Sequence, residues 1–382
     1  MATFGDHPPL PDSLESLLGD KTVSTLFLKA DCPPRVKTGH ITELRLEDIE
    51  SEKWDKPTLE SLGNELITVI EQHNHRSDCF VEIEREGCRI LQAGDLRITC
   101  AWPPFSDAWE ITVVRPVAHL TLADYELDPR LIRRLSDHHR GVFVVGKPGS
   151  GKTTSLYAGL KEISDRSQNI LTIEDPVEYA LDGIGQTQVN NKTGLTFAKG
   201  LRAILRQDPD IVMVGEIRDK ETAEIAIQAS LTGHLVLSTV HTNSAVNAIT
   251  RLRDMGIEPY LLSSSLVYVL SQRLVRCLCE KCKVIDDESS KSKILQKYNV
   301  KKTIYKAVGC SKCENTGFKG RLSIGEFILM DEKISELIYR SSSENEISEY
   351  VFANNKKLFE NGILALEDGK TSLSELLRIT EE

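Results

Sequence analysis

A glycine-rich segment with the composition of a phosphate-binding loop lies near the middle of the chain. Residues 146–153 read Gly-Lys-Pro-Gly-Ser-Gly-Lys-Thr and fit the pattern G-x-x-x-x-G-K-[ST]. The segment follows an apolar run and precedes a helical pattern, so backbone N–H groups and a helix N-terminus can surround phosphate oxygens. We expect Lys152 to contact the β- and γ-phosphates of ATP and the Thr153 hydroxyl to bind Mg²⁺. The expected cofactor-binding residues are Gly146, Lys147, Pro148, Gly149, Ser150, Gly151, Lys152, Thr153 and Thr154.

Carboxylates follow two other apolar runs. Glu216 ends the segment Ile-Val-Met-Val-Gly-Glu, where it can bind the Mg²⁺ shell or polarise the attacking water. Glu174, Asp175 and Glu178 form a cluster after a second run, and Glu174 or Glu178 is a candidate water activator. The alternatives are a helix-capping glutamate at 216 and a solvated acidic loop at 174–178.

Two histidines and two arginines could also act on the nucleotide. His234 and His241 flank the apolar run 235–239, but isolated histidines are often structural, and spacing alone leaves both interpretations open. Arg97 and Arg115 lie on expected N-terminal strands, from which they could reach a nucleotide of the same or a neighbouring subunit. For these arginines, and for Arg202, the alternative is a surface ion pair.

Four cysteines have the spacing of a structural zinc site. Cys279 with Cys282, and Cys310 with Cys313, form two Cys-x-x-Cys pairs, and four thiolates suit tetrahedral Zn²⁺. Unpaired buried thiols are the alternative, and a redox pair is disfavoured because neither motif opens a helix after a strand. Cys277 stays possible as a substitute ligand.

Composition narrows the classes of function. The 382 residues include 47 Lys+Arg and 57 Asp+Glu, a formal charge of −10, which argues against a general basic field for nucleic acid. No run approaches the roughly 20 apolar residues of a membrane span. The N-terminal residues lack a basic and apolar leader, so we expect no secretory signal and only a peripheral membrane role.

The patterns predict an α/β fold with several parts. A helix is expected from Thr58, followed by alternating strands in an antiparallel sheet. Apolar strands then alternate with helices, which indicates a mainly parallel sheet covered on both faces. The expected parts are a flexible arm (1–24), a small α+β N-terminal domain (25–118), a linker (119–130), a P-loop ATPase core (131–275), a tetracysteine zinc subdomain (276–326) and a C-terminal helical segment (327–382).

Residues from about 142 to 326 resemble the ATPases of type II secretion and type IV pilus assembly. The matching segments are Gly149-Ser-Gly-Lys-Thr-Thr, Thr172-Ile-Glu-Asp-Pro-Val-Glu-Tyr, 205–219, 231–243, Gln272-Arg-Leu-Val-Arg and 309–321. The resemblance implies a RecA-like core, an acidic "Asp box" at 174–178, a Walker B segment ending at Glu216 and a "His box" at His234 and His241. It also favours Arg97 and Arg115 as interdomain arginines.

The resemblance further implies a hexameric cytoplasmic motor at the inner membrane that works with a polytopic platform protein and uses ATP, Mg²⁺ and Zn²⁺. The tetracysteine element favours secretion or extension over retraction. Stretches before residue 117 instead resemble archaeal PilT-type ATPases with PIN and KH domains, although neither domain is evident here.

These patterns predict a motor in which ATP hydrolysis drives assembly of a secretion pseudopilus or a pilus-like filament. We expect no stable nucleic-acid binding. Two alternatives remain, namely a P-loop ATPase linked to nucleic acid and a nucleotide-switched scaffold without turnover.

Overall fold

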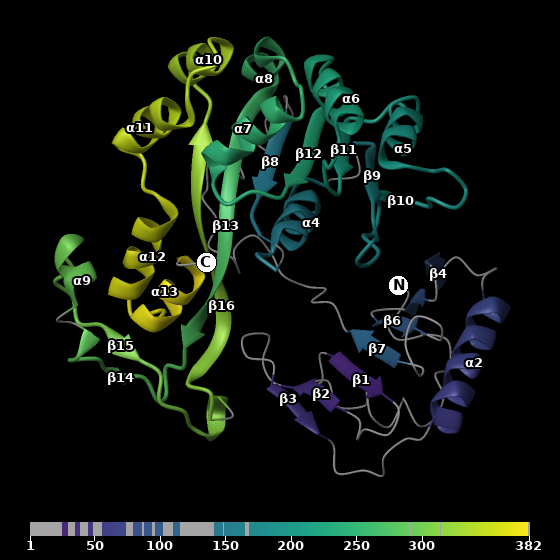
Figure 1. Cartoon of the computed structure of the whole chain (residues 1–382), viewed down its shortest axis with the longest axis horizontal. Helices are drawn as coiled ribbons and strands as arrows, with labels where there is room; N and C mark the ends of the chain where they lie inside the picture. Colours follow the sequence, from purple (N-terminus) through teal and green to yellow (C-terminus); the bar gives the residue numbers. More distant parts are fainter. Residues whose placement is uncertain are drawn as a thin grey trace. The chain divides into compact units, whose positions relative to one another are not determined.

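The chain forms two compact units, Met1–His119 and Leu120–Glu382 (Figure 1). The computed structural model describes residues 25–29, 35–38, 45–48, 56–73, 79–85, 88–93, 96–101, 110–114, 141–147, 149–164, 168–289, 292–313 and 315–380. The expected arm and linker lie outside these residues. In the described part of the chain, no helix combines the length and apolar character needed to cross a membrane.

The first unit contains an antiparallel sheet and one long helix. Its strand order is β3-β2-β1-β7-β6-β5-β4, and every pair is antiparallel. Alternate residues are buried, such as Leu26 and Leu28 in β1, because successive strand side chains point to opposite faces. Helix α2 (Lys56–His73) buries Leu59, Leu62 and Leu66. The strands are β1 (Thr25–Lys29), β2 (Arg35–Thr38), β3 (Arg45–Asp48), β4 (Cys79–Arg85), β5 (Cys88–Ala93), β6 (Leu96–Ala101) and β7 (Glu110–Val114).

The second unit is built on a mainly parallel sheet. The order β10-β9-β11-β12-β8-β13-β16 has parallel pairs as far as β13, and only β16 is antiparallel to its neighbour. This α/β arrangement agrees with the fold class predicted from the sequence. The strands are β8 (Gly141–Val145), β9 (Ile170–Glu174), β10 (Gly185–Gln188), β11 (Ile211–Val214), β12 (Leu235–Val240), β13 (Leu266–Leu278) and β16 (Phe318–Leu329).

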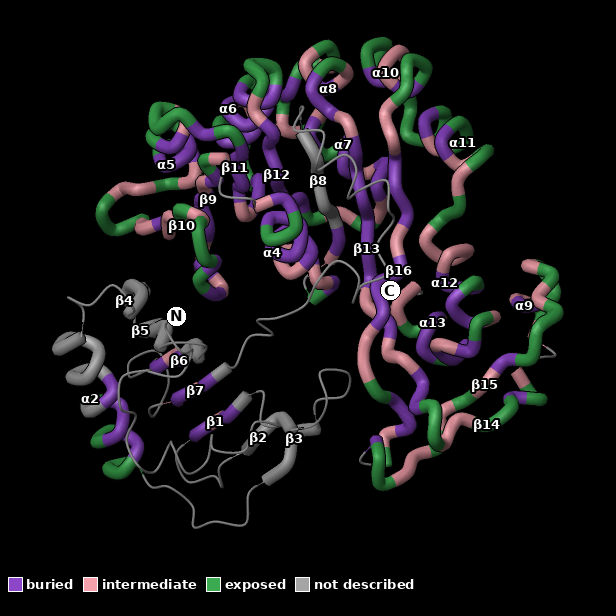
Figure 2. The backbone as a smooth tube through the Cα atoms, turned by 180° about the vertical axis from the view of Figure 1, so that it is seen from behind, coloured by how far each residue is buried: buried purple, intermediate pink, exposed green. Residues whose placement is uncertain are grey.

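Helices bury the sheet of the second unit on two sides. Residues of α5 to α8, α10 and α11 join strand residues in one buried apolar cluster, whereas α4 packs on β8 and β12 (Figure 2). Most of these helices have side-chain caps, such as Asp219 at α6 and Ser244 at α7, which satisfy N–H groups of the first turn. The helices are α4 (Lys152–Ile163), α5 (Phe197–Ile204), α6 (Lys220–Leu231), α7 (Ala245–Asp254), α8 (Pro259–Ser265), α10 (Glu332–Tyr339) and α11 (Glu344–Asn354).

The strands β13 and β16 extend well past the sheet that contains β8. Their antiparallel register runs from Tyr268 opposite Leu329 to Leu278 opposite Phe318. The hairpin therefore crosses the positions 275/276 and 326/327, where the sequence suggested the zinc subdomain begins and ends. At its far end it carries α9 (Lys293–Lys297), the short strands β14 (Val284–Ile285) and β15 (Tyr305–Lys306), and the four cysteines.

A buried ion pair fastens the last helix to this hairpin. Glu375 of α13 (Leu373–Thr380) is 1% exposed and accepts hydrogen bonds from the Arg276 backbone N–H (3.0 Å) and Nη2 (2.7 Å). Arg378 donates to the same carboxylate. Helix α12 (Leu358–Glu367) joins α13 in an apolar cluster with Val275 and Leu322. The C-terminal helices and the hairpin are thus held together by both apolar packing and a satisfied charge.

We predict that Glu375→Gln destabilises the second unit by about 3 kcal/mol at pH 7. The substitution removes the buried negative charge with which Arg276 and Arg378 pair. Burial opposes ionisation of Glu375, but hydrogen bonds from Arg378 and Arg276 outweigh it and lower its pKa to about 2. A folded-state pKa below the unfolded value gives stability that is present above about pH 5 and lost as the pH falls toward 2.

Urea denaturation followed by circular dichroism at several pH values measures this effect. The difference between Glu375→Gln and wild type should shrink below about pH 4. Glu349→Gln, at an exposed position of α11, is the matched control and should match wild type. A Glu375→Gln protein as stable as wild type at pH 7 would contradict the role assigned to this ion pair.

Candidate nucleotide site and zinc site

The register of the parallel sheet brings three chain segments together at the carboxyl ends of its strands. Val145 at the end of β8 lies opposite both Val240 of β12 and Ser271 of β13. The next residues along these strands are Gly146, His241 and Gln272, so they follow at the same level. Carboxyl ends of neighbouring parallel strands form the usual ligand crevice of open α/β sheets. The structure thus places the glycine-rich loop at the position where ligands of such sheets bind.

The loop has the backbone geometry of a phosphate cradle. Gly149 and Gly151 have φ angles of 77° and 85°, in the left-handed region that favours glycine. Gly151 is the N-cap of α4 and supplies no side-chain cap, so the first N–H groups of the helix are left for a ligand. This uncapped N-terminus fits phosphate oxygens, which carry the charge that the helix dipole favours.

Lys152 lies buried beneath the loop. Its side chain is 8% exposed, and Nζ donates to the carbonyl oxygens of Gly146 (2.9 Å) and Lys147 (3.1 Å). Burial lowers its pKa to about 8; the charge of Glu216 opposes this shift, and Arg273 adds to it. Two carbonyl oxygens are weaker partners for an ammonium group than anionic oxygens, so a phosphate can replace them.

Glu216 follows β11 and lies close to His241 and Lys152. It is 8% exposed, forms an ion pair with Arg218, and its Oε2 lies 3.3 Å from His241 Nε2. No side chain or N–H group of the described residues makes a well-aligned hydrogen bond to Oε2. A buried carboxylate oxygen without a donor suits a water molecule or a hard cation such as Mg²⁺. The Thr153 hydroxyl, in the first turn of α4, is the other ligand that the motif predicts for this ion.

Glu174 has a more enclosed environment than Glu178. Tyr157 Oη donates to Glu174 Oε2, while Thr172 and Gln186 donate to Oε1. Burial raises the pKa of Glu174, although these three hydrogen bonds oppose the shift. Both oxygens are therefore occupied within the protein, and Glu174 connects β9, β10 and α4. Glu178, the other water activator suggested by the sequence, is half-buried.

The two histidines lie at opposite ends of strand β12. His241 follows β12 beside Glu216, and burial together with the charge of Lys152 lowers its pKa. His234 precedes β12, and its Nδ1 lies 3.0 Å from the Ala229 carbonyl oxygen. At about 3.3 Å per residue, the seven steps from His234 to His241 separate the two by about 23 Å. Of these two histidines, His241 is the one that adjoins the phosphate loop.

Of the arginines predicted from the sequence, the structure describes some only in part. Arg97 is in β6 opposite Val114, but its side chain lies outside the described residues, as does the whole of Arg115. Arg202 pairs with Glu221 at 2.7 Å on the surface, in agreement with the ion-pair alternative. Arg218 forms an ion pair with Glu216 and therefore lies beside the site.

Sequence reasoning did not assign roles to three site residues. Tyr157 is fully buried on α4, and Gln272 and Arg273 come from β13. Arg273 donates to the carbonyl oxygens of Gln272 (3.1 Å) and Asn243 (3.4 Å). The segment Gln272-Arg-Leu-Val-Arg was a visible signal, since polar residues interrupt an otherwise apolar pattern, but its chemistry depends on the neighbouring loop.

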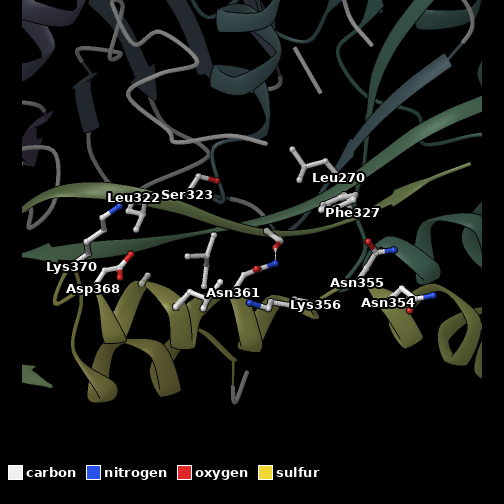
Figure 3. A pocket seen from close by; sticks show the side chains of 14 residues that line it. Leu270, Leu322, Ser323, Phe327, Asn354, Asn355, Lys356, Asn361, Asp368 and Lys370 are labelled. Atoms are coloured by element: carbon white, nitrogen blue, oxygen red, sulfur yellow. Dashed lines mark hydrogen bonds between the residues drawn. The ribbon is translucent and has the colours of Figure 1, made fainter. Parts of the chain in front are cut away.

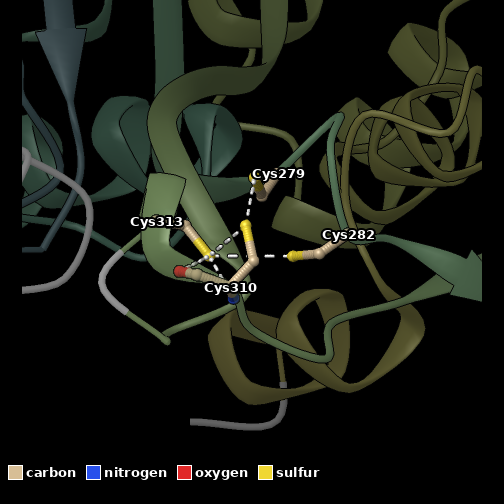
Figure 4. A group of neighbouring side chains, drawn as sticks. All are labelled: Cys279, Cys282, Cys310 and Cys313. Atoms are coloured by element: carbon tan, nitrogen blue, oxygen red, sulfur yellow. Dashed lines mark hydrogen bonds between the residues drawn. The ribbon is translucent and has the colours of Figure 1, made fainter.

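The four cysteines converge at the far end of the β13–β16 hairpin (Figure 4). All four Sγ atoms lie within 4.8 Å of one another. Cys279 and Cys310 Sγ are 3.9 Å apart, and Cys313 Sγ is 3.7 Å from both Cys282 and Cys310. Tetrahedral zinc with Zn–S distances of about 2.3 Å requires sulfur atoms about 3.8 Å apart. The donor set and its spacing therefore fit Zn²⁺.

Backbone groups favour a thiolate at Cys313. Burial opposes ionisation, but the N–H groups of Cys310 and Gly317 donate to Cys313 Sγ, each at 3.2 Å, and with neighbouring thiols they lower its pKa to about 6. Gly317 has a φ of 79°, and a Cβ there would lie 2.9 Å from the Val308 nitrogen, so the turn requires glycine. Cys277 is not part of the cluster that the structure places together.

A cavity of about 460 Å³ lies elsewhere, along β16 and α12 (Figure 3). Asn361 of α12 donates to the Gly325 carbonyl oxygen at 2.7 Å within its lining. None of the residues predicted to bind nucleotide or zinc lines this cavity.

Comparisons with known proteins agree with this geometry. The sequence pattern of the family described as "Type II/IV secretion system protein" matches residues 115–378, more than half of the chain. The chain therefore belongs to the type II/IV secretion system protein family, as its motifs predicted. It is 51% identical over 265 residues to "Type II secretion system ATPase E" of Vibrio cholerae, covering 69% of this chain and 52% of that protein.

Other relatives give the same result. Over 246 residues the chain is 54% identical to "Type II secretion system protein E" of Pseudomonas aeruginosa, covering 64% and 49% of the two chains. The chain thus spans about half the length of the curated relatives it matches. The solved ATPase DotB of Legionella pneumophila has the same fold, with a TM-score of 0.68, 21% identity, and coverage of 99% and 97%. The resemblance of residues before 117 to archaeal PIN- and KH-containing ATPases stays a prediction.

We predict that the purified chain contains about one zinc ion and that Cys282→Ser or Cys310→Ser reduces this content below about 0.2 per chain. Loss of zinc should also open residues 279–321 to proteolysis, because binding of the ion supplies much of the folding energy of such small modules. Mass spectrometry of metal content and limited proteolysis are the measurements. Cys277→Ser is the control and should keep its zinc; equal zinc in all three variants would exclude the four-cysteine site.

Proposed function

We propose that this chain is the ATP-hydrolysing motor of a type II secretion system or of a related pilus-like machine. The observation that carries the proposal is the common sheet edge of Lys152, Glu216 and His241 around the uncapped N-terminus of α4. Membership of the secretion family and the name "Type II secretion system ATPase E" of a close relative support it.

The residues of the site suggest how hydrolysis proceeds. The β- and γ-phosphates of ATP bind N–H groups of the loop around Gly149 and Gly151 and of the first turn of α4, and Lys152 exchanges its two carbonyl partners for phosphate oxygens. The Thr153 hydroxyl and Glu216 would hold Mg²⁺, which would supply positive charge to stabilise the phosphates. Glu216, or Glu178 of the acidic loop, orients the attacking water.

His241 supports Glu216 in this arrangement. Its lowered pKa makes it neutral near pH 7, so it can accept or donate one hydrogen bond without adding a charge beside Lys152. A neutral ring at this position can respond to the γ-phosphate by changing its contact with Glu216. This assignment makes His241, rather than His234, the histidine of the site within one chain.

The assembly around the site is also part of the proposal. We infer a cytoplasmic homo-hexamer that associates with the inner membrane through a polytopic platform protein and drives filament subunits into place. Arg97 and Arg115 would then complete the nucleotide site of the same or a neighbouring subunit, and His234 could face a subunit contact. Zinc at the four cysteines would hold the end of the β13–β16 hairpin.

We predict that Lys152→Ala and Glu216→Gln each lower kcat for Mg²⁺-ATP hydrolysis at least about 100-fold, because each removes charge stabilisation from the transferring phosphoryl group. Lys152→Ala should also weaken nucleotide binding, whereas Glu216→Gln should retain it. Phosphate release measured against ATP concentration gives both quantities.

Glu162→Gln, at an exposed position in the last turn of α4, is the matched control and should hydrolyse ATP at the wild-type rate. A Lys152→Ala protein that is as active as wild type would exclude the proposed site. Tight ATP binding without turnover in wild type would favour the scaffold alternative. Stimulation by RNA or DNA that falls steeply with salt would favour the alternative linked to nucleic acid.

A further inference from the structure

Gln272 of β13 lies directly behind the phosphate loop and makes one hydrogen bond to the loop and one to α4. Its side chain is fully buried. The amide Nε2 donates to the Ser150 carbonyl oxygen at 2.8 Å, and Oε1 accepts from Ser155 Oγ at 3.0 Å. A carbonyl oxygen can only accept, so this orientation of the amide is the one that satisfies the contact with Ser150. Gln272 thus joins the last turn of the loop to the first turn of α4.

The bond to Ser150 sets the direction of a neighbouring N–H group. The peptide unit between Ser150 and Gly151 is planar and trans, so its C=O and N–H bonds point in opposite directions. Because Gln272 holds the carbonyl toward β13, the Gly151 N–H is directed to the other side of the loop. That side is where the phosphates bind under the proposed function.

Strand β13 also packs against both ends of the loop, with its backbone at Gly146 and with side chains at Gly151. A Cβ at Gly146 would lie 2.8 Å from the Gln272 carbonyl oxygen, and one at Gly151 would lie 3.2 Å from Gln272 Nε2. Two of the loop glycines therefore leave room for β13 as well as for phosphate. Gln272 is held in turn, since its carbonyl oxygen accepts a hydrogen bond from Arg273.

We propose that Gln272 is a positioning residue that keeps the phosphate loop in the form that orients the γ-phosphate. The inference rests on the proposed ATPase function and extends it to a residue that does not touch the nucleotide. Gln272 acts through the Ser150–Gly151 peptide unit and through Ser155. Loss of Gln272 should lower kcat more than it weakens nucleotide binding. A misdirected N–H group loses the most stabilisation in the transition state, where negative charge develops on the phosphate oxygens.

We call the two hydrogen bonds of Gln272 to Ser150 and Ser155 the clamp. Gln272→Met tests the clamp, since it keeps the side-chain volume and removes both hydrogen bonds. We expect kcat to fall at least about tenfold, while KM for ATP changes less than about threefold. Gln228→Met, at an exposed position of α6, is the matched control and should leave both constants unchanged. Wild-type kcat in Gln272→Met would overturn the proposal.

Gln272→Glu supplies a readout that loss of packing does not affect. A buried carboxyl group favours its neutral form, whose O–H can donate to the Ser150 carbonyl oxygen in place of Nε2. The activity of Gln272→Glu relative to wild type should therefore rise as the pH is lowered from about 9 to about 6. The same ratio for Gln272→Met should stay constant, and a constant ratio for both variants would count against the clamp.

Hydrogen exchange separates this proposal from the proposed function, because it requires no hydrolysis. In Gln272→Met, amides of residues 146–156 should exchange at least about tenfold faster than in wild type, while those of β12 stay unchanged. Unchanged exchange in the loop would overturn the clamp even if wild type hydrolyses ATP. Faster exchange in a chain that hydrolyses no ATP would support the clamp and reject the proposed function.

Discussion

The parallel register of β11, β12, β8 and β13 is the constraint on which the site depends. The four strands run parallel, so Glu216 just beyond β11, His241 and Gly146 directly after β12 and β8, and Gln272 within β13 meet although they are far apart in the sequence. A slip of one residue in any pair would turn every side chain of that strand to the opposite face. Buried apolar side chains on both faces fix this register, and the loop glycines and Lys152 then have little freedom in where they lie.

The hairpin of β13 and β16 connects this edge to the rest of the second unit. Gln272 contacts the phosphate loop, Arg276 pairs with buried Glu375, and Cys279 begins the cysteine cluster, all within one stretch of β13 and the turn that follows it. Polar side chains along this stretch therefore link it in turn to the phosphate loop, to α13 and to the cysteine cluster. Hydrogen bonds to the buried side chains of Gln272 and Arg273 allow these two polar residues to remain within a strand of the sheet.

Much of the second unit could be predicted from the sequence, because its short apolar strands are separated by glycines and by capped helices. The run Ile211–Val214 and the helix from Phe197 are clear cases, and the glycine-rich loop lies where the motif predicts. The extent of β13 was not predictable, because Ser271, Gln272 and Arg273 interrupt the apolar pattern. The hydrogen bonds of Gln272 with Ser150 and Ser155 join segments that are distant in the sequence. Glu174 shows the same limit, since no local pattern reveals that Tyr157 and Gln186 enclose its carboxylate.

Under the proposed function, the loop and α4 bind the nucleotide through its phosphate groups, which should therefore supply most of the binding energy. Calorimetric titration of the full chain with Mg²⁺-ADP and with adenosine tests this claim directly. The account predicts that adenosine binds at least about 100-fold more weakly than ADP, a difference of about 2.7 kcal/mol. Equal affinities for the two ligands would contradict the account, because the loop would then contribute nothing to recognition.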